Sequence, residues 1–242
     1  MKQVIVIPAR MKGTRLPGKP LIEIMGKAII HHVWDRCRQV IEQENIYIAT
    51  EDDEIDQYCK NNNIQCVVTQ VAETAIDRIK YFSDLIPADA YINIQGDEPI
   101  VNISDIQILL EYNRKYPDRV AFGKTQANVK EFNDISKAKV VCDLEGKLLY
   151  SSRAGIPINN KGEFISADRA IWLYAFNKAA LDAYNQHQGK TYLDMLEDNE
   201  IIRFLEIGLP VYCIDMVGDS WAVDELKDLA IVKQKIKSRK LP

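Results

Sequence analysis

The stretch that decides the fold is Val4-Ile5-Val6-Ile7 together with residues 8–20, which read Pro-Ala-Arg-Met-Lys-Gly-Thr-Arg-Leu-Pro-Gly-Lys-Pro. The four apolar residues predict a buried parallel strand, because a strand covered on both faces is apolar at every position. The segment that follows carries four cations and two glycines. Such a loop at the end of a first strand is suited to hold phosphates, since backbone N–H groups and cations can reach the same anion. The alternative is an ordinary solvated loop.

Strand-like and helix-like segments alternate from this point through the first half of the chain. The expected strands are residues 4–7, 46–49, 66–69 and 90–94. The expected helices are residues 28–41, 52–61, 73–85 and 103–115, the second capped by Asp52. This order predicts a parallel sheet wrapped by helices, with ligands beyond the carboxyl ends of the strands.

The second half is less regular. The expected elements are strands at 139–142, 148–151, 171–176 and 211–214, an extended loop at 155–167, and helices at 192–206 and 223–236. We therefore expect one α/β domain over residues 1–242, with an antiparallel elaboration at about 148–176.

Composition narrows the class of ligand. The net charge of −4 over 242 residues argues against nucleic acid or an anionic membrane as partner, so the basic loop favours a small anion. The odd number of cysteines and the absence of a Cys-x-x-Cys pair predict reduced thiols, no zinc site and a cytoplasmic location. No signal peptide and no membrane span are expected.

Several acidic and basic residues later in the chain are candidates for chemistry. Asp97 follows an apolar strand and Asp224 follows a strand and loop, so both could hold Mg²⁺; the alternatives are a turn residue and a helix cap. Glu197, Glu200 and Arg203 are spaced to share one helix face, where a solvated ion-pair row is the alternative. Arg153 could clamp a carboxylate or be a surface arginine.

Taken together, these residues resemble the CMP-Kdo synthetases, the 3-deoxy-manno-octulosonate cytidylyltransferases, over nearly the whole chain. The most specific motifs are Ile7-Pro8-Ala9-Arg10 with residues 14–21, and Gly96-Asp97-Glu98-Pro99. Weaker matches lie at 47–52, 139–141, 150–157 and Glu197-x-x-Glu200-x-x-Arg203. The resemblance implies a Rossmann-like three-layer nucleotidyltransferase fold with a mostly parallel sheet, and an antiparallel elaboration for dimerisation and sugar binding.

The implied reaction joins CTP to a 3-deoxy-2-keto sugar acid and releases pyrophosphate, by in-line displacement at the α-phosphate in a Mg²⁺-dependent homodimer. The resemblance assigns catalytic roles to Arg10, Lys19 and Asp97, and metal binding to Asp97 and Asp224. It assigns the nucleotide to Ala9, Arg10, Arg15, Lys19, Thr74, Arg78 and Gln95. It assigns the sugar acid to Gln95, Arg153, Tyr174 and Glu200. Lys12 is expected to be a bystander.

The chain departs from the family pattern near the base and the sugar. The departures are Ala75 and Ile76 in place of glycine and threonine, Ala170 and Trp172 in place of histidine and glycine, Ile201 in place of glutamine, and Ala222, Glu225 and Leu226 around Asp224. These changes leave two other functions open, a sugar nucleotidyltransferase that uses another nucleotide and a non-catalytic nucleotide-binding relative.

Overall fold

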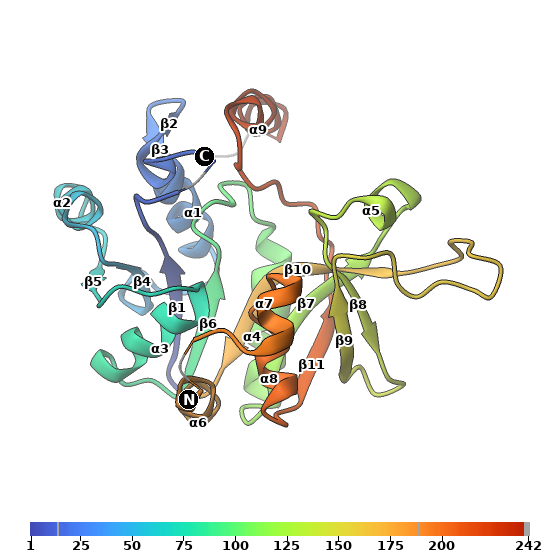
Figure 1. Cartoon of the computed structure of the whole chain (residues 1–242). Helices are drawn as coiled ribbons and strands as arrows, with labels where there is room; N and C mark the ends of the chain where they lie inside the picture. The colour runs from blue at the N-terminus through green and yellow to red at the C-terminus, as the bar shows by residue number, and fades with distance from the viewer. Residues whose placement is uncertain (14, 188, 240–242) are drawn as a thin grey trace.

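The core of the molecule is a mixed sheet (Figure 1). A computed structural model describes residues 1–13, 15–187 and 189–239, and in that part of the chain nine strands join one sheet. They are β1 Gln3–Pro8, β4 Ile46–Thr50, β5 Cys66–Val68, β6 Ala90–Ile94, β7 Val120–Gln126, β8 Lys139–Cys142, β9 Leu148–Ser152, β10 Asp168–Phe176 and β11 Val211–Asp215. The main order is β11-β7-β10-β6-β1-β4-β5, with β8 pairing both β10 and β9. The pairs β6-β1, β1-β4, β4-β5 and β11-β7 are parallel, whereas β10 runs antiparallel to β6, β7 and β8.

Helices cover both faces of this sheet, which confirms the expected three-layer α/β fold. Ile5 and Ile7 of β1 face the apolar cluster of α1 Ile29–Cys37, α2 Asp53–Asn61 and α4 Ile103–Lys115. Val4 and Val6 face the cluster of α3 Ala75–Leu85, α6 Lys178–Gln186 and α8 Ile202–Glu206. Both faces of β1 are therefore buried, as its unbroken apolar run predicts.

The C-terminal helix packs against the basic loop that follows β1. Leu16 packs in one apolar cluster with Val232 and Ile236 of α9 Leu226–Arg239 and with Ile24 of the small hairpin formed by β2 Glu23–Ile24 and β3 Lys27–Ala28. A short 3₁₀ helix, Lys19–Leu21, lies between Leu16 and this hairpin in the sequence. The basic loop is thus fixed by apolar contacts at its centre while its cations stay at the surface.

One part of the chain projects from the body. Figure 1 shows β8, β9 and the loop from residue 153 to residue 167 extending away from the rest of the sheet, with α5 Val129–Asn133 beside them. Ile158 and Ile165 in this loop are 54% and 71% exposed. This is the extended loop that the sequence predicts.

Two expectations about secondary structure are wrong, and two elements were not predicted. The helix expected at 192–206 is two helices, α7 Tyr192–Glu197 and α8, because Asp198 adopts the left-handed region with φ 45°. Strand β7 and helix α6 were not expected from the sequence at all. The last helix begins at Leu226 rather than at residue 223.

No helix in the described part of the chain combines the length and the apolar character needed to cross a bilayer. The five cysteines are free thiols, three of them buried and two half-buried.

Candidate functional site

A cavity of about 450 Å³ opens at the carboxyl ends of β1 and β6. Its walls come from the basic loop, the segment before α3, the end of β6, β10 and the region of α7 and α8. Ten of the candidate site residues line it: Ala9, Arg10, Arg15, Lys19, Thr74, Arg78, Gln95, Asp97, Glu200 and Asp224. Arg153 and Tyr174 do not line it.

The basic loop is folded by backbone hydrogen bonds around Met11. The amides of Gly13 and Gly18 both donate to the Met11 carbonyl, at 3.0 and 2.9 Å, and Gly18 has φ 71°, which favours glycine. The Met11 amide donates to Asp52 Oδ2 at 2.7 Å. Asp52 is therefore not the side-chain cap expected for α2, because its carboxylate is used to hold the loop.

Lys19 brings two distant carboxylates to one point. Its Nζ lies 2.7 Å from Asp97 Oδ2 and 3.4 Å from Asp224 Oδ1. The backbone fixes this arrangement, since the amide of Val223 donates to the Asp97 carbonyl at 2.9 Å. In the first turn of α9 the carboxylate of Asp228 accepts from the amides of Asp224 and Glu225, and the Asp224 side chain lines the cavity.

Gly96 allows the end of β6 to approach β1. A Cβ added there would lie 2.6 Å from the Pro8 carbonyl oxygen, so any other residue would push the two strand ends apart.

The other cations differ in how tightly they are held. Arg15 pairs with Asp224 at 3.1 Å, and its side chain is 62% exposed. Arg10 donates to the Glu73 carbonyl at 3.4 Å. Arg78 is buried, pairs with Glu51 and donates to Thr69 Oγ1; burial lowers its pKa to about 10. Arg10 and Arg15 can thus move onto a ligand, whereas Arg78 is fixed.

Glu200 is a buried carboxyl group in the part of the cavity that Lys190 and Asn199 also line. Burial raises its pKa to about 7, and the carboxylates of Asp77 and Asp194 add to the shift. The backbone amide of Ile76 donates to Glu200 Oε2 at 3.3 Å, which partly offsets that shift. This carboxyl group exchanges its proton near neutral pH.

A pH series on E200Q tests that environment. The pKa of Glu200 rises from 4.5 to about 7 on folding, so the unfolded chain gives up this proton first as the pH rises. Wild type should lose stability relative to E200Q between about pH 4.5 and 7, and the difference should be constant above that range. Melting temperatures of both proteins at several pH values measure it. Burial also raises the pKa of Glu98 to about 7, but both proteins contain Glu98, so its contribution cancels in the difference between their melting temperatures. A difference that does not vary with pH would contradict the assignment.

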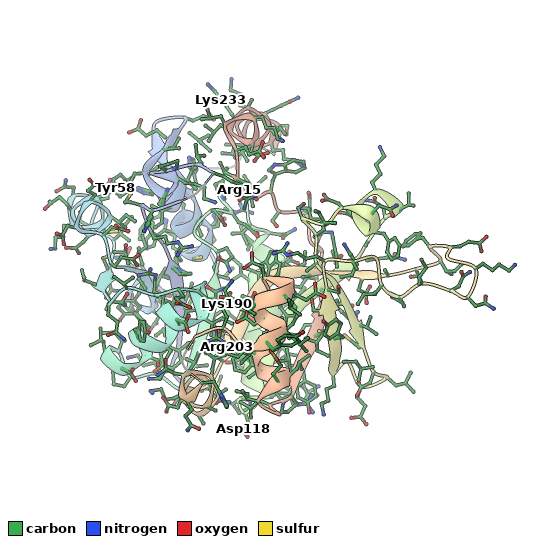
Figure 2. All side chains as sticks on the ribbon, viewed as in Figure 1. Arg15, Tyr58, Asp118, Lys190, Arg203 and Lys233 are labelled. Carbon is green, nitrogen blue, oxygen red and sulfur yellow. The ribbon has the colours of Figure 1, made fainter. Side chains whose placement is uncertain are left out.

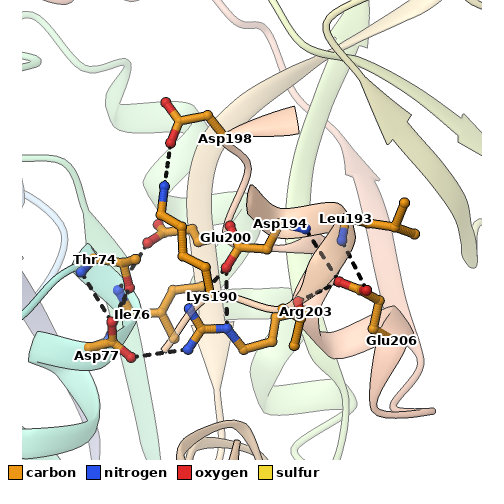
Figure 3. Close-up of polar contacts among 11 residues, drawn as sticks. Thr74, Ile76, Asp77, Lys190, Leu193, Asp194, Asp198, Glu200, Arg203 and Glu206 are labelled. Atoms are coloured by element: carbon orange, nitrogen blue, oxygen red, sulfur yellow. Dashed lines mark hydrogen bonds and ion pairs between the residues drawn. The ribbon is translucent and has the colours of Figure 1, made fainter. Parts of the chain in front are cut away.

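A buried ion-pair network supports the wall that carries Glu200 (Figure 3). Arg203 donates to Asp194 Oδ2 at 2.9 and 3.2 Å and to Asp77 Oδ1 at 3.3 Å. Its guanidinium lies 4.1 Å from the centre of the Tyr184 ring. Arg203 and Asp194 are each 1% exposed, so this is not the solvated row that helical spacing allows. The network joins α3, α7 and α8.

Arg153 and Tyr174 are not placed where the sequence interpretation puts them. The guanidinium of Arg153 donates to the carbonyls of Glu197, Asp198 and Ile135, at 2.7, 2.8 and 3.2 Å, and so braces the turn after α7. Tyr174 is fully buried within the aromatic stack of Phe122 and Phe176. Burial raises the pKa of Tyr174 well above its usual value, with the Glu200 carboxylate as the next cause.

The structure also adds residues that sequence reasoning missed. Lys190, Asp194, Asp198 and Asn199 line the cavity, and Asp198 and Asn199 lie at the break between α7 and α8. Lys12, expected to be a bystander, lines it too.

Three of the departures from the family pattern do not line the cavity. Ile76, Ala170 and Ile201 lie in the apolar core against α3 and α8. Ala75 and Trp172 do line the cavity. Trp172 packs 5.9 Å from the Phe122 ring and forms part of the wall.

The oxygen ligands near Lys19 fit a magnesium ion. Two carboxylate oxygens already converge on one cationic atom, and Mg²⁺ is commonly held by one or two carboxylates together with phosphate oxygens. Within residues 1–13, 15–187 and 189–239, no group of three or more His, Cys, Asp or Glu side chains is arranged to hold a metal.

Comparison with known proteins gives matches that span the cavity. The model of the cytidylyltransferase family matches residues 4–215. The chain is 31% identical to the 3-deoxy-manno-octulosonate cytidylyltransferase of Koribacter versatilis, over 99% of this chain and 92% of that protein. It is 32% identical to the Escherichia coli protein of the same name, over 92% and 91%.

Solved structures agree with these sequence matches. CMP:2-keto-3-deoxy-manno-octonic acid synthetase complexed with CTP superposes with a TM-score of 0.92 at 31% identity, over 99% of this chain and all of that one. HddC from Yersinia pseudotuberculosis, at 16% identity and a TM-score of 0.70, shares the fold.

Proposed function

The chain belongs to the cytidylyltransferase family of nucleotidyltransferase enzymes, and from this premise we propose that it activates a 3-deoxy-2-keto sugar acid with CTP. The products would be the CMP-sugar and pyrophosphate. The observation that carries this proposal is the convergence of Lys19, Asp97 and Asp224 at the point where the basic loop meets the cavity.

The basic loop is suited to the triphosphate. Arg10 is bound to the Glu73 carbonyl, and Arg15 forms a half-exposed ion pair with Asp224. Both side chains can turn onto phosphate oxygens at small cost. Lys19 then stabilises the charge that grows on the departing pyrophosphate. Thr74, Arg78 and Gln95 line the side of the cavity that the nucleoside would occupy, and Ala9 lets the backbone approach it.

The reaction needs no covalent intermediate with the protein. An anomeric hydroxyl oxygen of the sugar acid forms a bond to the α-phosphorus as the bond to the pyrophosphate oxygen breaks, and the hydroxyl proton passes to solvent. The protein holds the two reactants in line, a contribution that grows with the precision of the alignment.

We propose Mg²⁺ as cofactor, held by Asp97 and Asp224 together with phosphate oxygens. When bound, it would neutralise phosphate charge and orient the oxygens that it contacts. Lys19 would then exchange its carboxylate partners for the pyrophosphate.

The sugar acid would occupy the part of the cavity lined by Trp172, Gln95 and Glu200. Glu200, with its pKa near 7, can accept from or donate to a sugar hydroxyl. The retained carboxylates argue against a non-catalytic relative, since loss of Asp97 or Asp224 would be the expected mark of one.

The test is pyrophosphate release with each of the four nucleoside triphosphates, Mg²⁺ and a set of ulosonic acids that includes 3-deoxy-manno-octulosonate. We expect release that requires both substrates, with CTP preferred. Release with no preference for CTP would favour the alternative nucleotide, which Ala75 at the cavity wall motivates. Binding of CTP without turnover of any sugar acid would favour the non-catalytic alternative.

We propose that the chain forms a homodimer through the projecting loop at 153–167. Ile158 and Ile165 expose apolar surface there that a second copy could cover. Sedimentation at micromolar concentration should give twice the mass of 27.7 kDa, and a monomer would contradict the dimer. The cytoplasmic location, and the expectation of no nucleic-acid or membrane partner, stay predictions from composition.

A further inference from the structure

One cation in the cavity stands apart from the phosphate loop. Lys190 lies between Gly189 and α7 and lines the cavity together with Asp198, Asn199 and Glu200. Figure 2 shows it beside α7, away from Arg15. Among the residues that the structure describes, the other cations lining the cavity are Arg10, Lys12, Arg15, Lys19 and Arg78. Four of these belong to the basic loop, and Arg78 is bound to Glu51.

Lys190 is charged, and its side chain forms a partly exposed ion pair with Asp198. Its Nζ contacts Asp198 Oδ1 at 2.5 Å, and the two side chains are 33% and 71% exposed. This hydrogen bond raises the pKa of Lys190, so the side chain carries its proton at neutral pH. A pair with so much exposure contributes little to stability. A ligand carboxylate could therefore replace Asp198 at small cost.

The arginine that could compete for this role is already committed. Arg153 gives three N–H groups to main-chain carbonyls of Ile135, Glu197 and Asp198. These bonds brace the turn that presents Asp198 and Asn199, and using Arg153 on a ligand would dismantle that turn. Arg203 is likewise enclosed by Asp194 and Asp77.

We propose that Lys190 binds the carboxylate of the sugar-acid substrate and thereby selects sugar acids over neutral sugars. The inference rests on the proposed function, because it takes such an acid as the substrate. In the free enzyme the Asp198 carboxylate pairs with the Lys190 ammonium group (Figure 3). On binding, the substrate carboxylate takes the place of the Asp198 oxygen.

The test is a cycle in which both the lysine and the carboxylate are changed. Turnover of CTP is measured for wild type and K190M, each with 3-deoxy-manno-octulosonate and with its C1 carboxamide. K190M should lower kcat/KM for the acid by about 10- to 100-fold, the range for loss of a charged hydrogen bond, through a higher KM for the acid. It should change kcat/KM for the carboxamide by less than about threefold, and the KM for CTP should stay within the same margin.

Companion variants separate charge from structure. K190R keeps the cation and should retain most of the activity on the acid. D198N frees the lysine, and asparagine tolerates the left-handed backbone at that position, so the KM for the acid should fall. K233M alters an exposed lysine on the outer side of α9 (Figure 2) and should change nothing.

Two results would overturn the inference. If K190M lowers kcat/KM equally for the acid and the carboxamide, or if D198N is as damaging as K190M, the pair has a structural role only. If wild type turns over no ulosonic acid with CTP, the proposed function fails and this inference fails with it. The first result leaves the proposed function standing, so the two failures are distinguishable.

Discussion

Replacing Asp97 by asparagine is expected to lower kcat by roughly 10²–10³-fold, the scale for removing one electrostatic contact to the reacting groups. Asparagine keeps the shape of the side chain but removes the charge that pairs with Lys19 and that we assign to Mg²⁺. Stability should change little, because Lys19 keeps Asp224 as a partner and the Asp97 side chain is 32% exposed. Pyrophosphate release under saturating CTP and sugar acid measures the effect.

The matched control is D118N, which changes an exposed carboxylate far from the cavity (Figure 2). It should have wild-type kcat. Full activity of D97N would show that the metal assignment is wrong. A fall in melting temperature large enough to explain lost activity would move the role of Asp97 from catalysis to folding.

Replacing Arg203 by methionine is expected to destabilise the protein by about 3–5 kcal/mol, the cost of leaving buried charge without a partner. The reason is specific to this site, since Asp194 and Asp77 both lose their cation while Asp194 is 1% exposed. The wall that carries Glu200 should loosen at the same time, because Arg203 ties α8 to α3. Urea unfolding measures the free energy.

Two further variants serve as a control and as a partial rescue for R203M. K60M breaks a surface pair between residues i and i+4, in which the lysine is 66% exposed, and should leave the free energy of unfolding almost unchanged. The double variant R203M/D194N removes one of the stranded charges and should recover part of the loss. A cost for R203M no larger than that for K60M would mean that the network contributes nothing to stability.

The first half of the molecule could be predicted from sequence because its signals are local. An apolar run such as Val4-Ile5-Val6-Ile7 has one reasonable interpretation, and a polar loop after such a strand must lie at the sheet edge. Asp97 and Asp224 are far apart in the sequence, and the backbone contact between their segments is a hydrogen bond from the Val223 amide to the Asp97 carbonyl. The resemblance supplied that pairing, and spacing alone could not.

The wall formed by α7 and α8 could not be predicted because its conformation depends on long-range contacts. Helical spacing from Tyr192 to Glu206 continues through Asp198, where the backbone turns left-handed. Arg153, which directly follows β9, braces that turn through the carbonyls of Glu197 and Asp198. The side chain expected to clamp a substrate is thus used on the backbone, and Lys190 enters the cavity from a loop with no helical or strand pattern.

The most direct test of the central claim is the ³¹P spectrum of a reaction containing the protein, Mg²⁺, CTP and 3-deoxy-manno-octulosonate. The account predicts that the three CTP signals are replaced by those of pyrophosphate and of a single phosphodiester, the CMP-sugar. Formation of CDP with inorganic phosphate would place the attack at a different phosphorus. That result, or an unchanged CTP spectrum with every ulosonic acid, would contradict the account.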